Sequence, residues 1–292
     1  MRFDMLPGMA AKARIAIVGT GNLGTALALA LKDAGYTIDV LLRRSGKSQG
    51  KARNVAKKIG ARATSNPAQV RAEWVWFCVP DSEIARVAST LAEQLPWEGR
   101  IALHSSGALT SDALAPLRRR GASVASVHPL MTFVRNSRPS LTGVPFAMEG
   151  DPVALRTARR IVRNLGGKAF FIRKEDKAAY HTWGTFASPL MTALLATTEE
   201  VAAMAGVSRK AARNRAIPIL RQTLENYAAF GAPDAFSGPI IRGDVDTVRR
   251  HLRALNNVPI ARDVYTALAR AALQYLPAKN KNALMWILGT ER

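Results

Sequence analysis

Cysteine is almost absent from this sequence: Cys78 is the single one among 292 residues. One cysteine cannot form a disulfide within the chain, and it excludes a metal site built from several thiolates. Cys78 lies in the apolar run 74–79, where a buried, inert side chain is favoured over a reactive nucleophile.

The sequence also lacks the long apolar runs of signal peptides and membrane spans. Near the N-terminus, Asp4, Pro7 and Gly8 interrupt the apolar residues. The longest uncharged stretch of the second half, residues 181–198, contains a histidine, several threonines and Pro189, so it predicts a buried helix. We therefore expect a cytoplasmic protein that does not enter a membrane.

Acidic residues are scarce: 21 Asp and Glu face 42 Lys and Arg, a net charge of +21. Such an excess suits nucleic acid, acidic lipid or an anionic ligand. The basic residues are scattered, however, and in residues 152–165 four arginines share one helical face while apolar residues occupy the other. Because no nucleic-acid-binding motif accompanies them, we expect no dedicated nucleic-acid partner.

A glycine motif between an apolar strand and a helical pattern, RIAIVGTGNLGTALALAL in residues 14–31, is the most informative stretch. Gly19 suits the tight turn, Gly21 lets backbone approach a pyrophosphate, and Gly24 lets the helix pack closely on the strand. The phosphates would lie at a helix N-terminus, which favours negative charge. A glycine turn that only packs two elements is the alternative. The predicted cofactor-binding residues of this turn are Gly19, Gly21, Asn22, Leu23 and Gly24.

The end of the second predicted strand, residues 36–42, indicates which cofactor binds. An acidic residue there binds the ribose of NAD, whereas arginine accommodates the 2′-phosphate of NADP. Asp39 has about the expected spacing from the glycine turn, but apolar residues continue the strand beyond it. The strand therefore ends at Arg43, Arg44 and Ser45, which can bind a phosphate dianion and predict NADP. Ordinary exposed charges in a basic protein are the alternative.

Apolar runs alternate with helical patterns through the first part of the chain and then stop. The predicted strands are residues 15–18, 36–42, 62–64, 74–79, 100–103, 122–127, 144–148 and 168–172. After residue 173 the pattern is helical almost to the end. We therefore predict an α/β Rossmann-type domain with a mostly parallel sheet in residues 1–173, and an all-helical substrate and dimerisation domain in residues 174–292.

Polar residues follow several predicted strands at their carboxyl ends, where open α/β sheets bind ligands. The first group is Val79, Pro80 and Asp81, which we assign to the cofactor, although Asp81 could serve only as a helix N-cap.

Two further strand ends deliver polar side chains to the same edge. We assign Ser105 to the cofactor and Ser106 and His128 to catalysis, with His104 beside them.

The first C-terminal helix carries Lys177 and His181, four residues apart and hence on one face. Turned to the nicotinamide, this pair could supply the proton donor and the substrate anchor. Alternatively, Lys177 is exposed near the helix start and His181 is half-buried beneath it. In a later turn-rich segment, Pro239, Arg242 and Asp244 are predicted to bind substrate, and Asp244 also fits a helix N-cap.

The motif order GTGNLG, VPD, HSSGAL, SVHPLMTF, YHTWGTFAS and SGPIIRGD resembles bacterial Rossmann-like oxidoreductases whose C-terminal helical domain is a domain of unknown function. The sequence is more distantly similar to the 6-phosphogluconate dehydrogenase-like superfamily, which includes 3-hydroxyisobutyrate dehydrogenase, pyrroline-5-carboxylate reductase and prephenate dehydrogenase. This resemblance implies NAD(P)-linked hydride transfer, a cleft between two domains, and a homodimer through the helical domains.

The resemblance also assigns residues. Hydroxyacid dehydrogenases have a lysine and an amide four apart where this chain has Lys177 and His181, so a histidine replaces the amide. Prephenate dehydrogenases have a serine and a His-Pro pair at the substrate, which Ser106, His128 and Pro129 resemble. We expect NADPH and a small carboxylate-bearing substrate as partners, with His128 or His181 handling the proton. A non-catalytic NADP-binding sensor or scaffold is the alternative, and a nucleic-acid binder is a weaker one.

Overall fold

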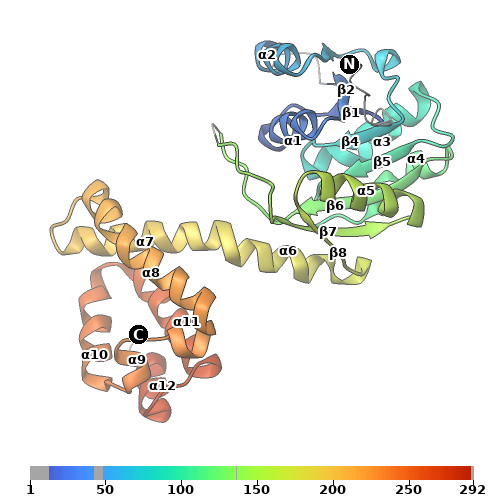
Figure 1. Cartoon of the computed structure of the whole chain (residues 1–292). Coiled ribbons are helices and arrows are strands. Elements are labelled where there is room, and N and C mark those ends of the chain that lie inside the picture. The colour runs from blue at the N-terminus through green and yellow to red at the C-terminus, as the bar shows by residue number, and fades with distance from the viewer. Residues whose placement is uncertain (1–12, 43–48, 136, 291–292) are drawn as a thin grey trace, which may run out of the picture. The chain divides into compact units, whose positions relative to one another are not determined.

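The computed structural model of this chain describes residues 13–42, 49–135 and 137–290. Its N-terminal part is built on an eight-stranded sheet of order β3-β2-β1-β4-β5-β6-β7-β8 (Figure 1). The strands are β1 (Arg14–Val18), β2 (Thr37–Leu42), β3 (Arg62–Thr64), β4 (Trp74–Phe77), β5 (Ile101–His104), β6 (Ser123–Pro129), β7 (Pro145–Gly150) and β8 (Lys168–Phe171). All neighbours pair in parallel except β6 and β7, which are antiparallel. The predicted mostly parallel sheet is confirmed.

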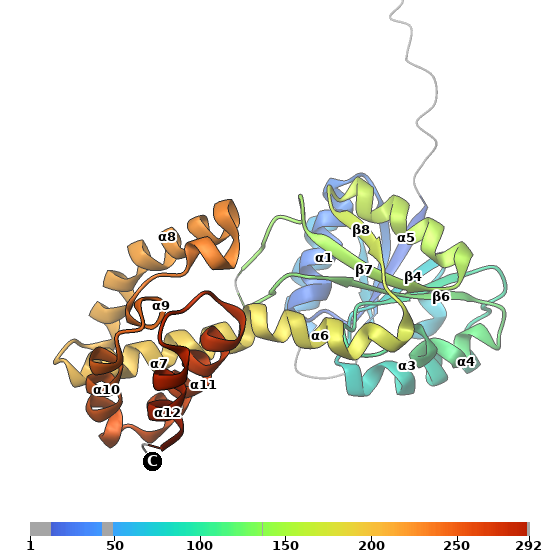
Figure 2. The same cartoon turned by 90° about the horizontal axis from the view of Figure 1, so that it is seen from below.

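Helices cover both faces of this sheet (Figure 2). They are α1 (Asn22–Asp33), α2 (Gln49–Ile59), α3 (Asp81–Gln94), α4 (Ala115–Arg118) and α5 (Pro152–Asn164). Apolar residues of α1, α2 and α5 form one core cluster with the sheet, and those of α3 and α4 form a second. Because it is covered on both sides, the central strand β4 is apolar and buried at every position.

The described residues from Phe186 onward form a separate, all-helical unit. It begins with a π-helical turn, Phe186–Leu190, that contains Pro189. The helices that follow are α7 (Met191–Met204), α8 (Arg209–Ala235), α9 (Pro239–Arg242), α10 (Val245–Ala254), α11 (Pro259–Tyr275) and α12 (Lys281–Thr290). Its core joins α10, α11 and α12 through residues such as Leu252, Leu273 and Leu284.

The division between the two units falls after Thr185. Helix α6 (Lys177–Thr185) therefore belongs with the sheet, although the strand pattern of the sequence stops at residue 173. Two of its side chains, Lys177 and Tyr180, are buried there. The residues of the expected catalytic group consequently all lie in the first unit.

The buried helix predicted for residues 181–198 is wrong for the single chain. The segment is broken by the π-helical turn, and the whole of α7 has no buried residue. The long helix α8 buries only Ala212. Apolar composition cannot tell which surface will cover a helix, and this chain by itself leaves the helix uncovered.

Among the described residues, no single helix is long and apolar enough to cross a membrane. One pair of helical segments, residues 174–204 and 209–242, is long and apolar enough when the two are taken together, and the pair is bent by 118°.

Candidate functional site

The glycine turn joins β1 to α1 and is crowded on one side and open on the other. A methyl group at Gly19, where φ is +102°, would lie 2.6 Å from the Cys78 carbonyl oxygen. At Gly24 it would lie 2.1 Å from the Gly19 carbonyl oxygen, so α1 approaches the turn as closely as glycine allows. At Gly21 it would meet no atom within 4 Å. Close packing therefore accounts for glycine at positions 19 and 24 but not at position 21.

The start of α1 is also open. Gly21 is its N-cap, and no side chain caps the helix. A cavity of about 400 Å³ lies beside this turn, lined by residues that include Gly19, Thr20, Ser65 and Val79. A helix N-terminus next to a cavity at the carboxyl ends of parallel strands is suited to an anionic ligand.

Of the side chains predicted to distinguish NADP from NAD, the structure describes Asp39. Arg43, Arg44 and Ser45 lie outside the described residues. Asp39 accepts a hydrogen bond from the Arg71 backbone N–H at 2.9 Å and lies 3.9 Å from the Arg62 guanidinium, inside β2. Asp39 thus lies before the end of the strand, as the sequence predicts.

The turn after β4 contributes to the same cavity through Val79 and Pro80. Just before it, burial raises the pKa of the Cys78 thiol to about 12, so the cysteine is unreactive near neutral pH. Asp81 begins α3 without capping it, because the N-cap position is Pro80. Its carboxylate instead accepts a hydrogen bond from the Ser106 hydroxyl at 2.7 Å.

The Ser106 side chain organises the loop that follows β5. Its Oγ donates to Asp81 and accepts the backbone N–H groups of Ala108 and Leu109, at 3.2 and 2.9 Å. A hydroxyl has one donor and two acceptor positions, so all three are occupied. Ser105 is likewise engaged, since the Trp76 indole N–H donates to its Oγ at 2.8 Å.

Lys177 crosses from α6 to this loop and is only 1% exposed. Its ammonium donates to the Ser106 carbonyl oxygen at 3.0 Å and to the Ser126 Oγ at 2.6 Å. Burial lowers the Lys177 pKa to about 8, while the negative charges of Glu149 and Asp81 raise it. The alternative with an exposed Lys177 above a half-buried His181 is therefore wrong, because the lysine is buried and His181 is exposed.

His128, near the end of β6, is held by Tyr180 of α6. The His128 Nδ1 and the Tyr180 hydroxyl are 2.7 Å apart, and the two rings meet edge to face. Burial lowers the His128 pKa to about 4, and the positive charges of Lys177 and His181 act in the same direction. His128 is thus neutral at pH 7.

His128 and His181 converge on Gly107. Their ring centroids are 6.2 Å apart. A methyl group at Gly107 would lie 2.6 Å from His181 Cδ2 and 2.9 Å from His128 Nε2, so both imidazoles approach the bare backbone of that residue. The structure therefore brings His128, His181, Lys177 and Ser106 together.

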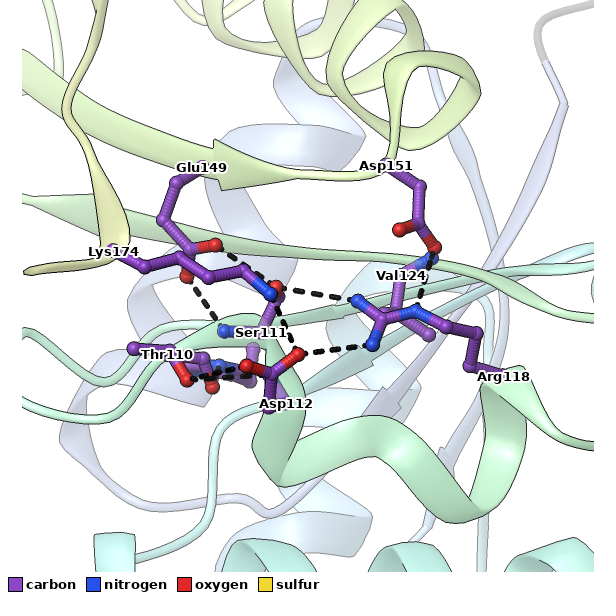
Figure 3. Close-up of polar contacts among 9 residues, drawn as sticks. Thr110, Ser111, Asp112, Arg118, Val124, Glu149, Asp151 and Lys174 are labelled. Atoms are coloured by element: carbon purple, nitrogen blue, oxygen red, sulfur yellow. Dashed lines mark hydrogen bonds and ion pairs between the residues drawn. The ribbon is translucent and has the colours of Figure 1, made fainter.

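A buried carboxylate fixes the far end of the same loop (Figure 3). Glu149 of β7 accepts the Ser111 backbone N–H at 2.6 Å and its hydroxyl at 2.8 Å. Glu149 lies opposite Ser126 in the antiparallel pair of strands, and Ser126 is a hydrogen-bond partner of Lys177. At the surface, Asp112 binds both Arg118 and Lys174, and these bonds lower its pKa.

The remaining substrate candidates lie in the second unit. Asp244 is the N-cap of α10 and accepts the Thr247 N–H at 3.0 Å, which lowers its pKa. Arg242 is exposed at the end of α9, and Pro239 is its first residue. The capping function predicted for Asp244 is confirmed, whereas substrate binding by these residues stays a prediction.

Four residues of the site were given no function by the sequence analysis: Gly107, Ser126, Glu149 and Tyr180. Tyr180 and Gly107 lie within the motifs YHTWGTFAS and HSSGAL. A polar residue in an apolar strand, as at Ser126 and Glu149, was the available signal for the other two.

Family comparisons agree with this architecture. Residues 7–129 match a Rossmann-like domain, and residues 144–272 match a domain of unknown function, DUF2520. The chain therefore combines a Rossmann-like domain with a DUF2520 domain. No protein with a curated description matches the sequence significantly.

Solved structures share the fold over nearly the full chain. A Bacteroides fragilis protein assigned as an NADP oxidoreductase is 22% identical, with a TM-score of 0.75 over 89% of this chain and 98% of that one. A Thermotoga maritima protein is 24% identical, with a TM-score of 0.68 over 95% and 99%. A reductive aminase from Aspergillus terreus, in complex with NADPH and ethyl-5-oxohexanoate, is 16% identical, with a TM-score of 0.67 over 94% and 99%. At these identities the likeness shows a common fold.

Proposed function

We propose that this protein is an NADP-dependent oxidoreductase that transfers a hydride between the nicotinamide and a small carbonyl, imine or hydroxy substrate. The observation that carries the proposal is Gly21, which faces open space at an uncapped helix start beside a cavity of about 400 Å³. Close packing requires glycine at positions 19 and 24, whereas at Gly21 the backbone has φ −66° and a methyl group would meet no protein atom, so the turn itself does not require glycine there. Fold neighbours described with NADP or NADPH support the same cofactor.

The residues of the turn fit a dinucleotide. Gly21 and the first N–H groups of α1 would hold the pyrophosphate, and Val79 and Pro80 line the adjoining cavity. Arg43 and Arg44 would hold the 2′-phosphate. When bound, the nicotinamide supplies or accepts the hydride, and the protein orients the substrate and handles the proton.

We assign proton transfer to His181, and to His128 a hydrogen bond to the reacting atom. His128 Nε2 has no protein partner among the described residues and faces Gly107, where His181 also approaches. Lys177 and Ser106 are positioning residues in this proposal, because the ammonium is buried and every hydrogen-bonding position of the hydroxyl is occupied. They fix the loop against which a substrate would lie.

The first test is the binding of NADPH and NADH to Gly21→Ala and to the unchanged protein. A methyl group at Gly21 contacts no protein atom, so the variant should fold normally while the methyl obstructs the pyrophosphate. We expect tighter binding of NADPH than of NADH, and at least tenfold weaker NADPH binding in the variant. Gly289→Ala in α12 is the control, since its methyl group would make only an ordinary contact at 3.8 Å.

Equal NADPH binding by Gly21→Ala and the unchanged protein would refute the proposed pyrophosphate site.

Turnover provides the second test. His128→Ala should bind NADPH normally and lose about 10²- to 10³-fold in kcat, as expected when a hydrogen bond to the charge that develops on the reacting atom is removed.

The finer points of the proposal concern the second unit. We propose that exposed Arg242 binds a substrate carboxylate, in which case Arg242→Gln raises KM for carboxylate substrates and leaves kcat nearly unchanged.

We also propose a homodimer through the helical unit. The exposed apolar residues of α7 and α8 support it: Met191, Leu194, Val201, Met204, Ile217, Ile219, Leu224, Tyr227 and Phe230. Light scattering that finds only monomer would contradict the dimer.

A further inference from the structure

We propose that Tyr180 is a positioning residue that fixes His128 as the tautomer with its proton on Nε2, so that the site presents an N–H donor to the reacting atom. This inference rests on the proposed function for its catalytic meaning. The tautomer itself can be tested without any substrate.

The hydrogen bond between the two side chains has only one satisfactory direction. Tyr180 is 6% exposed, and a buried phenol needs an acceptor for its proton. Among the described residues, the hydrogen-bond partner of its hydroxyl is His128 Nδ1, at 2.7 Å. If Nδ1–H donated instead, the phenolic proton would have no acceptor. The O–H therefore donates to Nδ1, and the proton of the neutral imidazole is on Nε2.

The surroundings hold both partners in these states. Burial raises the pKa of Tyr180 to about 12, so the phenol keeps its proton. Phe170 and Trp183 pack edge to face against the Tyr180 ring, with centroids 6.0 and 6.1 Å away. Around His128, the charged or titratable neighbours are Lys177, His181, Asp81 and His104, and the net effect with burial is a pKa of about 4.

An Nε2–H donor has a consequence for the class of substrate. A carbonyl oxygen accepts this hydrogen bond, and the bond strengthens as negative charge develops on the oxygen while hydride is added to the carbon. His128 keeps its proton in this step, and the proton that completes the alcohol comes from His181 or from water. A protonated imine has no lone pair on nitrogen and cannot accept it. The arrangement therefore favours ketones and aldehydes over protonated imines, although several fold neighbours are described as imine reductases.

The test is nitrogen NMR of protein labelled with ¹⁵N-histidine, which gives four histidine spin systems. His128→Asn identifies the His128 signals by their loss. We expect Nε2 to be the protonated nitrogen at pH 7, and Nδ1 to show the shift of a hydrogen-bonded, unprotonated nitrogen. In Tyr180→Phe, Nδ1 should move toward the value of a free, unprotonated nitrogen.

The chain offers a matched control in its second unit, where Tyr265 lies 3.1 Å from His251 Nδ1. Tyr265→Phe should leave the His128 signals unchanged. A protonated Nδ1 in the unchanged protein overturns the proposal, and so does an Nδ1 signal that Tyr180→Phe does not move. If Tyr180→Phe does not fold, the protonated nitrogen of the unchanged protein still decides the result.

Turnover then separates this inference from the proposed function. NADPH oxidation should be at least tenfold faster with simple ketones or keto acids than with methylpyrroline, a cyclic imine. The reverse preference overturns the substrate class. Turnover of neither set contradicts the proposed function, while the NMR result still decides the tautomer.

Discussion

The buried imidazole of His104 predicts that acid destabilises the first unit. His104 is 0% exposed; its Nδ1 accepts the Ser106 N–H at 3.1 Å, and its Nε2–H donates to the Thr110 carbonyl oxygen at 3.0 Å. Both ring nitrogens are therefore satisfied in the neutral form. Burial lowers the His104 pKa from 6.5 to about 4. A proton added to His104 Nδ1 would point at the Ser106 N–H, and the hydrogen bond between the two groups would be lost.

The sign follows from proton binding by the two states. Between pH 6.5 and 4 the unfolded chain binds the His104 proton and the folded chain does not, so the free energy of unfolding falls as the pH falls through this window. At about 1.36 kcal/mol per pKa unit, the full loss from this residue is about 3 kcal/mol. Above pH 6.5 His104 is unprotonated in both states, so its contribution to the free energy of unfolding changes little with pH.

His104→Asn removes the titration while its amide oxygen can still accept the Ser106 N–H. Urea unfolding at several pH values, followed by tryptophan fluorescence, measures the effect, since Trp74, Trp76 and Trp97 are all buried in the first unit. Between pH 7 and 4 the variant should lose about 3 kcal/mol less than the unchanged protein.

Val124→Ala provides the control for general destabilisation. Val124 is buried on β6, and its truncation should lower stability at every pH by a similar amount. His104→Asn with the same pH slope as the unchanged protein would refute the reasoning.

Substitutions at three other positions test the packing and hydrogen bonding of the first unit and a helix cap of the second. Gly24→Ala places a methyl group 2.1 Å from the Gly19 carbonyl oxygen, so it should lower stability by about 1–3 kcal/mol in urea unfolding; an unchanged midpoint would contradict the close packing. Glu149→Ala removes both acceptors of Ser111 and should lower stability by about 2 kcal/mol, measured in the same way, whereas a neutral result would mean that water replaces the carboxylate. Asp244→Ala should weaken α10 by about 1 kcal/mol in hydrogen exchange, and Asp244→Asn should not; equal losses would exclude capping as the cause.

Much of the first unit could be predicted from the sequence because its strands are short apolar runs that end at polar residues. The runs 74–79 and 100–103 correspond to β4 and β5, which pair in parallel. Parallel pairing brings strand ends to one edge, which is why His104 and His128 could be placed near each other without coordinates.

The partners of these histidines could not be predicted in the same way. Glu149 reaches the site because β7 runs antiparallel to β6, and nothing in an apolar run fixes strand direction. Tyr180 reaches His128 from a helix 52 residues further along the chain. Contacts of this kind depend on how α6 packs against the sheet, which the periodicity of a single segment does not determine.

The error over residues 181–198 has a similar origin. Apolar helices are usually buried, but the covering surface need not belong to the same chain. Pro189 also interrupts the helical hydrogen bonds, and the chain accommodates it with a π-helical turn.

The division after Thr185 also affects how the protein can be cut into parts. The two family matches meet between residues 129 and 144, which falls between β6 and β7, inside one sheet. Excision there would leave β6 as an exposed edge and remove Glu149, Lys177 and Tyr180. A fragment intended to fold alone must extend to Thr185, so sequence modules and folding units differ in this chain.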